Sequence, residues 1–169
     1  TAVIDPLGTQ GWLRPNHLHP PFDNPKARQA LVHAVNQENY LQAIIGNPKL
    51  YSACAAYFIC GTPNETAVAT EALKNVNLDK AKQLLKEAGY KGEKIILMQP
   101  TDIPVLNGAS LVTAQMLRDI GMKVEVQAMD WSTLTSRRAE KKSPADGGWN
   151  IFHTYSTGAD VTSPISNIG

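Results

Sequence analysis

The chain has 169 residues, a length that suits one α/β domain with a buried core. Its composition, 43% hydrophobic and 18% charged, is that of an ordinary globular protein, and no apolar run approaches the roughly 18 residues that span a bilayer. The formal net charge is +1, with basic and acidic residues alternating, which argues against a nucleic-acid partner because such binders carry a basic face.

The chain opens at residues 1–5 without a start methionine or the basic segment of a signal peptide. We expect this opening to be an internal boundary, a mature terminus or a trimmed end. Residues 11–16 then predict a short strand ended by proline. Residues 17–22 predict an extended connection, because a residue before proline is kept out of the helical region.

A long helix is expected after this connection. Asn24 supplies a capping side chain and Pro25 fits the first helical position. Apolar residues recur at helical spacing as far as Ile45, with a break expected near Asn36. The glycine and proline of residues 46–48 end the pattern.

Further elements follow an irregular segment at residues 47–76. Asn77 caps a second helix, which Gly89 ends in a left-handed conformation. The next expected elements are a buried strand at residues 94–98, a third helix ending at Gly121 and a half-buried strand at residues 122–127.

The last part of the chain predicts a short helix capped by Asp130 and a strand at residues 149–154. Residues 156–169 have turn composition and no terminating element. The order strand, helix, helix, strand, helix, strand, helix, strand predicts an α/β fold, with a mixed, mainly parallel sheet flanked by helices.

The two cysteines, Cys54 and Cys60, lie six positions apart in the irregular segment. A disulfide across so short a loop is sterically possible if the segment turns, and would fit an oxidising compartment. Two small buried thiols are the alternative. A metal site is disfavoured, since neither cysteine has a CxxC partner or a nearby pair of further ligands.

Four stretches form a pattern that is specific through its order: PPFDNPKARQAL at residues 20–31, NLDKAKQLLKEAGY at 77–90, a strand with a small helix across 117–131, and WNIF at 149–152. Together they resemble the peptide-type extracytoplasmic solute-binding family, family 5, which includes oligopeptide, dipeptide and nickel binders. The resemblance covers residues 10–160.

The resemblance implies that residues 1–169 are one lobe of a type II periplasmic-binding-protein-like fold, in a longer protein whose two lobes close around a ligand. The ligand would be a peptide or a related small solute. The partners would be the remaining lobe and the membrane permease of an ABC importer, and the location periplasmic or extracellular. No cofactor, metal or chemistry on the ligand is implied.

Residues at the carboxyl ends of strands are the physical candidates for ligand contacts. Thr101 and Asp102 follow the strand at residues 94–98, and Trp131 follows the next strand and begins a short helix. The alternative for Trp131 is a core position beneath that helix. The alternative for Thr101 and Asp102 is that their side chains form the turn before Pro104.

Tyr155, Ser156 and Asp160 are expected to follow the last strand. The resemblance implies a role for Asp160, because dipeptide-binding relatives use an aspartate near this position to pair with the peptide amino terminus. An Asx-turn carboxylate is the alternative. These relatives also place an arginine where residues 99–102 have no basic side chain, which argues against a dipeptide with a free carboxylate and favours a cationic or neutral ligand.

Two other classes of function stay open. One is a sensory or scaffold domain that uses the same fold without transport. The other is a small hydrolase based on Cys54 or His153, although no nucleophile elbow, P-loop or dinucleotide fingerprint occurs. For His153 a core position with satisfied hydrogen bonds is the simpler interpretation, and His17 and His19 are interpreted as a solvated loop pair.

Overall fold

The computed structural model describes residues 6–68, 70–163 and 165. Within these residues, no helix combines the length and the apolar character needed to cross a membrane.

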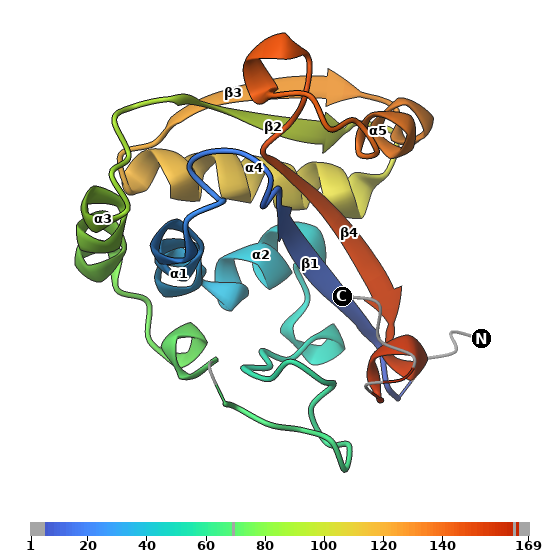
Figure 1. Cartoon of the computed structure of the whole chain (residues 1–169). Coiled ribbons are helices and arrows are strands. Elements are labelled where there is room, and N and C mark those ends of the chain that lie inside the picture. Colours follow the sequence, from blue (N-terminus) through green and yellow to red (C-terminus); the bar gives the residue numbers. More distant parts are fainter. Residues whose placement is uncertain (1–5, 69, 164, 166–169) are drawn as a thin grey trace.

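A four-stranded mixed sheet forms the centre of the protein (Figure 1), in the order β1 (Thr9–Pro15), β4 (Ile151–Thr157), β2 (Lys94–Pro100) and β3 (Lys123–Met129). Strand β2 runs parallel to both β3 and β4, whereas β1 pairs with β4 antiparallel along its whole length. The expected mixed α/β sheet is confirmed, with the antiparallel strand at one edge.

Strands β2 and β4 pair at a single position, Leu97 opposite Ile151. Beyond Ile151, β4 leaves β2 and continues with β1 as a two-stranded ribbon that extends away from the rest of the sheet (Figure 1). This divergence separates the carboxyl end of β4 from the carboxyl ends of β2 and β3.

The described residues form five α-helices around this sheet. They are α1 (Pro25–Ala34), α2 (Gln37–Ile44), α3 (Leu78–Glu87), α4 (Pro104–Asp119) and α5 (Trp131–Arg137). Short 3₁₀ turns, η1 (Pro48–Leu50), η2 (Glu71–Lys74), η3 (Pro144–Asp146) and η4 (Gly158–Val161), lie in the connections.

The helix ends follow from local chemistry. Asn24, Asn77 and Asp130 each cap a helix by accepting a backbone N–H bond, as expected. The break near Asn36 is also confirmed, because its side chain caps α2 by accepting from the backbone N–H groups of Glu38 and Asn39.

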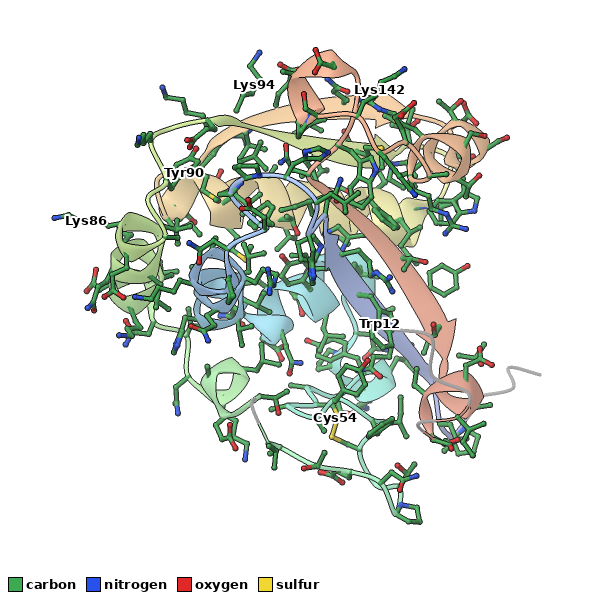
Figure 2. The ribbon with its side chains drawn as sticks, in the orientation of Figure 1. Trp12, Cys54, Lys86, Tyr90, Lys94 and Lys142 are labelled. Atoms are coloured by element: carbon green, nitrogen blue, oxygen red, sulfur yellow. A yellow bond between two sulfur atoms is a disulfide. The ribbon has the colours of Figure 1, made fainter. Side chains whose placement is uncertain are left out.

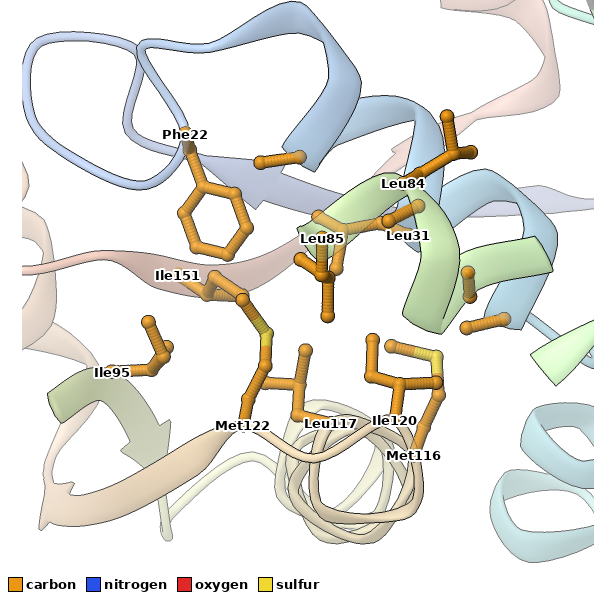
Figure 3. Close-up of a cluster of buried hydrophobic side chains, with 14 of the residues drawn as sticks. Phe22, Leu31, Leu84, Leu85, Ile95, Met116, Leu117, Ile120, Met122 and Ile151 are labelled. Atoms are coloured by element: carbon orange, nitrogen blue, oxygen red, sulfur yellow. The ribbon is translucent and has the colours of Figure 1, made fainter. Parts of the chain in front are cut away.

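Most of the core lies between the sheet and helices α1, α3 and α4 (Figure 3). Phe22, Leu31, Leu85, Leu117 and Ile151 are among its buried side chains. A smaller cluster packs against α5, and it consists of Met98, Leu134, Trp149 and Phe152 with the partly buried Met129 and Trp131. Both faces of the sheet are therefore covered.

The last strand differs from the expectation of residues 149–154. Strand β4 runs from Ile151 to Thr157 because its pairing with β1 continues as far as Thr9 opposite Thr157. Tyr155 and Ser156 therefore lie within β4 and do not follow it. The segment from residue 156 onward, expected to be without an element, begins in this strand and continues into η4.

Candidate functional site

The carboxyl ends of β2 and β3 lie side by side, with Pro100 opposite Met129. Thr101, the next residue after β2, donates its backbone N–H to the Met129 carbonyl at 2.9 Å and its hydroxyl to the same oxygen at 3.3 Å. The Thr101 side chain is exposed, so this turn presents it at the edge of the sheet.

The next residue, Asp102, connects this turn to helix α5. Its Oδ1 atom accepts the backbone N–H of Trp131 at 2.9 Å, which satisfies one of the free donors at the helix start. The structure thus brings Thr101, Asp102 and Trp131 together. The Trp131 side chain is partly buried against the small core cluster that contains Met98. The alternative of a core position beneath α5 is therefore correct for part of this side chain.

A second carboxylate stands at the same helix end. Asp130 accepts the backbone N–H and the hydroxyl of Thr133 at 2.9 and 2.6 Å. These hydrogen bonds lower the pKa of the Asp130 carboxyl, because they stabilise its ionised form. Asp130 is used as a cap, whereas Asp102 is exposed and its Oδ2 atom has no hydrogen bond to any of the described residues.

The other three candidates form a separate group on the ribbon. Tyr155 lies opposite Gly11 of β1 and is 47% exposed, and Ser156 lies opposite Gln10. Asp160, in η4, accepts a hydrogen bond from the Thr157 hydroxyl at 2.7 Å. Because β4 diverges from β2, this group does not adjoin Thr101, Asp102 and Trp131 (Figure 1).

Two surface hollows are found in the described part of the chain, the first of them along α5, which begins at Trp131. One, of about 630 Å³, is lined by Ser132, Thr133, Ser136, Arg137, Ala139, Glu140 and Gly147. The other, of about 550 Å³, lies beside the irregular segment and includes Asn36, Glu38, Cys60 and Glu65 in its lining. None of the six candidate residues lines either of these hollows, and all six are exposed or partly exposed.

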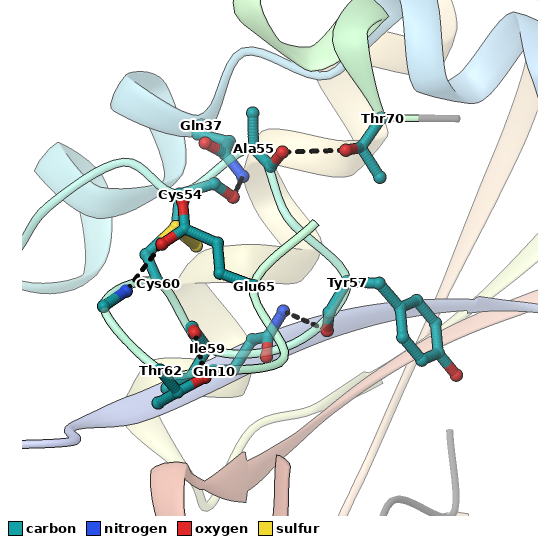
Figure 4. The surroundings of a disulfide bond; sticks show 11 residues. Gln10, Gln37, Cys54, Ala55, Tyr57, Ile59, Cys60, Thr62, Glu65 and Thr70 are labelled. Atoms are coloured by element: carbon teal, nitrogen blue, oxygen red, sulfur yellow. Dashed lines mark hydrogen bonds between the residues drawn. A yellow bond between two sulfur atoms is a disulfide. The ribbon is translucent and has the colours of Figure 1, made fainter. Parts of the chain in front are cut away.

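The two cysteines form a disulfide with an S–S distance of 2.06 Å, which settles the choice left open by their spacing (Figure 4). The closed loop is held from outside by the Gln37 side chain, which donates to the Cys54 carbonyl at 2.7 Å. Within this loop, Tyr57 makes an edge contact with Trp12 of β1, with ring centroids 5.9 Å apart. Cys54 is therefore not a free nucleophile.

Sequence reasoning missed Asn150, a buried polar residue that holds the centre of the sheet. Its Oδ1 accepts the Ile96 N–H at 2.8 Å and its Nδ2 donates to the Pro20 carbonyl at 3.3 Å. Its backbone N–H donates to the Ile96 carbonyl at 3.0 Å. A single asparagine before an apolar strand is the only sequence signal, and it does not reveal these partners.

His153 is a core histidine, as expected, and is 4% exposed. Its Nε2 atom lies 2.7 Å from the Thr113 hydroxyl. Burial lowers the pKa of the ring to about 4, partly opposed by a hydrogen bond to the Trp12 backbone, so the ring is neutral at pH 7.

Solved structures with similar folds include ABC transporter substrate-binding proteins. The substrate-binding protein CtaP from Listeria monocytogenes aligns with a TM-score of 0.81 over 96% of this chain and 32% of its own, at 19% identity. DppA from Helicobacter pylori, solved with the peptide STSA, aligns with a TM-score of 0.70 over 95% of this chain and 29% of its own, at 21% identity. The expected type II periplasmic-binding-protein-like architecture is confirmed.

Residues 2–167 match the family described as bacterial extracellular solute-binding proteins, family 5 Middle, and the chain belongs to this family. A probable peptide ABC transporter periplasmic-binding protein, y4tO of Sinorhizobium fredii, is 42% identical over 97% of the chain. The glutathione-binding protein GsiB of Shigella flexneri is 30% identical over 90% of it. The chain spans 32% and 29% of these two relatives, about a third of their length.

Proposed function

We propose that this chain is one lobe, residues 1–169, of an ABC-transporter substrate-binding protein that captures peptides or related small solutes outside the cytoplasmic membrane. Membership of the solute-binding family and the peptide and glutathione names of two relatives support this function. The protein binds its ligand and passes it on without chemical change.

The observation that carries the proposal is the convergence of Thr101, Asp102 and Trp131 at the carboxyl edge of β2 and β3. In α/β sheets, ligands bind outside the carboxyl ends of the strands. The Trp131 ring provides an apolar surface for stacking, and the second oxygen of Asp102 accepts a hydrogen bond or pairs with an amine. The Thr101 hydroxyl adds a polar contact.

Tyr155, Ser156 and Asp160 form a second part of the binding surface in this proposal. Their separation from the first group fits a ligand that is extended along the lobe. The remaining lobe of the longer protein closes over both groups, since ligands of two-lobed binding proteins are enclosed by hinge motion. The loaded protein then docks on the permease, and its location is periplasmic or extracellular.

The charges near Thr101, Asp102 and Trp131 favour a ligand that places an amine or a neutral group at this position. Residues 99–107 and 126–136 contain Asp102 and Asp130 but no lysine, arginine or histidine. A free ligand carboxylate would meet these two negative charges without a side-chain cation from either segment, which opposes its binding at this position.

The test uses the longer protein that carries this chain, titrated calorimetrically with glutathione and with the peptide STSA. Asp102→Asn removes the charge and keeps an oxygen that can accept the Trp131 N–H. Trp131→Ala removes the stacking surface. We expect each change to weaken binding at least roughly tenfold, a loss of about 1.4 kcal/mol.

The matched control is Asp119→Asn at the other end of α4, where the carboxylate accepts a bond from Gln115 and lies outside the proposed site. Equal effects of Asp102→Asn and Asp119→Asn would remove Asp102 from the site. Failure of a broad peptide pool, as well as both probes, to bind the unaltered protein would contradict solute capture.

A further inference from the structure

Three side chains from three elements form a buried hydrogen-bonded chain beside the β1–β4 ribbon. The Tyr40 hydroxyl on α2 lies 2.6 Å from Oγ1 of Thr113 on α4, and that oxygen lies 2.7 Å from Nε2 of His153 on β4. Thr113 has no exposed surface and His153 almost none. The two groups therefore satisfy each other without solvent.

The donors and acceptors of this hydrogen-bonded chain can be arranged in two directions. In the first, Tyr40 donates to Thr113 and Thr113 donates to Nε2 of His153. In the second, Nε2–H donates to Thr113, Thr113 donates to Tyr40, and the tyrosine donates to the sulfur of Met116 at 3.6 Å. Sulfur is a weak acceptor, so the last hydrogen bond in the second direction is weak.

The two ends of the chain favour the first direction. There the chain ends on Nε2 of the neutral ring, a good acceptor, whereas the second direction ends on sulfur. With Nε2 accepting from Thr113, the proton of the neutral ring lies on Nδ1. The Trp12 backbone raises the pKa of the ring against the larger lowering by burial, which agrees with a ring proton on Nδ1.

The hydrogen-bonded chain of side chains lies where β4 no longer pairs with β2. The last β2–β4 pair is Leu97 with Ile151, and His153 is the next residue of β4 on the same face. From there the ribbon has lost β2 as a partner, and His153 connects it to α4. Tyr155 is the following residue on that face, and Ser156 adjoins it.

We propose that Thr113 and His153 are positioning residues for the ligand contacts on β4: a one-way hydrogen-bonded chain, from Tyr40 through Thr113 to Nε2 of His153, holds the ribbon that carries Tyr155 and Ser156 against α4. The ligand part of this inference rests on the proposed function. The hydrogen-bond direction and the attachment of the ribbon stand independently of it.

The first test is nitrogen NMR of the full chain at pH 7, labelled only at histidine, with the His153 signals assigned by their loss in His153→Asn. We expect the shifts of a neutral ring protonated on Nδ1. A ring protonated on Nε2, or a rapidly exchanging mixture, would overturn the proposed direction.

The second test compares two substitutions of the same residue by amide hydrogen exchange. Thr113→Val keeps the shape and removes the hydroxyl, whereas Thr113→Ser keeps the hydroxyl. We expect the ribbon amides of β1 and β4 to exchange at least roughly tenfold faster in the valine variant, with near-normal rates in the serine variant. The β2–β3 amides serve as an internal reference, and Thr135→Val on α5 is the matched control.

A valine variant with unchanged ribbon exchange would contradict the positioning role. Uniformly faster exchange in β2 and β3 as well would indicate general destabilisation and contradict it too. Glutathione and STSA titrations of the same variants separate the two proposals. Loosening of the ribbon with unchanged affinity would remove Tyr155 and Ser156 from the ligand contacts, yet leave the anchoring chain intact.

Discussion

At the scale of single residues, buried polar side chains decide how the sheet is joined. Asn150 is 1% exposed, and its amide uses both a donor and an acceptor, to Pro20 and Ile96. It thereby connects the residue just before β4 to β2, next to the single β2–β4 pair. No charged side chain could take this position without an unpaired buried charge.

We therefore predict that Asn150→Asp destabilises the protein by on the order of 3 kcal/mol near pH 7. The change removes the donor to Pro20 and places a carboxylate in a buried site. Urea unfolding measures the loss, which should shrink at low pH where the new carboxyl is protonated. Asn75→Asp, at an exposed position, is the control, and an equal loss there would refute the explanation.

The buried ring of His153 predicts a pH dependence of stability. Burial lowers its pKa to about 4, compared with 6.5 for an ordinary histidine, so the unfolded chain takes up a proton more readily than the folded one. This contribution to stability is complete above about pH 6.5 and is lost as the pH falls to about 4. The loss is on the order of 3 kcal/mol.

Denaturant unfolding between pH 4 and 7 tests this dependence. The decline of stability over that range should be clearly smaller in His153→Asn than in the unaltered protein, because the variant lacks the titrating ring. Other groups contribute to both proteins and cancel in the comparison. Parallel pH curves for the two proteins would show that His153 is not responsible.

At the scale of elements, short local signals set where helices begin and end. Gly89 and Gly121 follow α3 and α4 with φ angles of +80° and +88°, a conformation that favours glycine. The irregular segment between α2 and α3 has few such signals. It is organised by the Cys54–Cys60 disulfide and by side-chain bonds such as that from Thr70 to the Ala55 carbonyl at 2.7 Å.

Replacing both cysteines by serine should loosen this loop and cost roughly 2 kcal/mol, the expected entropy of closing so short a loop. Faster hydrogen exchange should be confined to residues 54–70 and the adjoining part of β1, because the main core lies elsewhere. Reduction of the unaltered protein should reproduce the effect. Equal acceleration in α3 and β2 would contradict this confinement.

At the scale of the whole molecule, the sheet is covered on both faces, and charged side chains such as Lys86, Lys94 and Lys142 project outward (Figure 2). The six candidate ligand residues, in contrast, are exposed or partly exposed and line neither of the two hollows. A binding surface of this kind excludes water only when another body covers it.

We therefore predict that the 169-residue chain alone binds glutathione or STSA at least roughly tenfold more weakly than the longer protein that carries it, because only one wall of the site is present. Calorimetry on both proteins, with circular dichroism to establish equal folding of the shared part, measures the difference. Equal affinities would show that this chain holds a complete site and would contradict its assignment as one lobe.

Local patterns in the sequence determined the order and type of the main elements, the caps at Asn24, Asn77 and Asp130, and the positions of Thr101, Asp102 and Trp131 after the ends of their strands. These depend on neighbours within a few positions or on the rule that parallel strands end at a common edge. The motifs also pointed to the family, since their order is specific even where each is weak.

The tertiary structure alone decided the extension of β4 to Thr157, the separation of Tyr155, Ser156 and Asp160 from the first group, the disulfide, and the partners of the buried polar side chains. Asn150 bonds to a residue 54 positions away, and His153 to one 40 positions away. Such contacts leave no periodic trace in the sequence, because each depends on where the whole sheet places two strands and a helix.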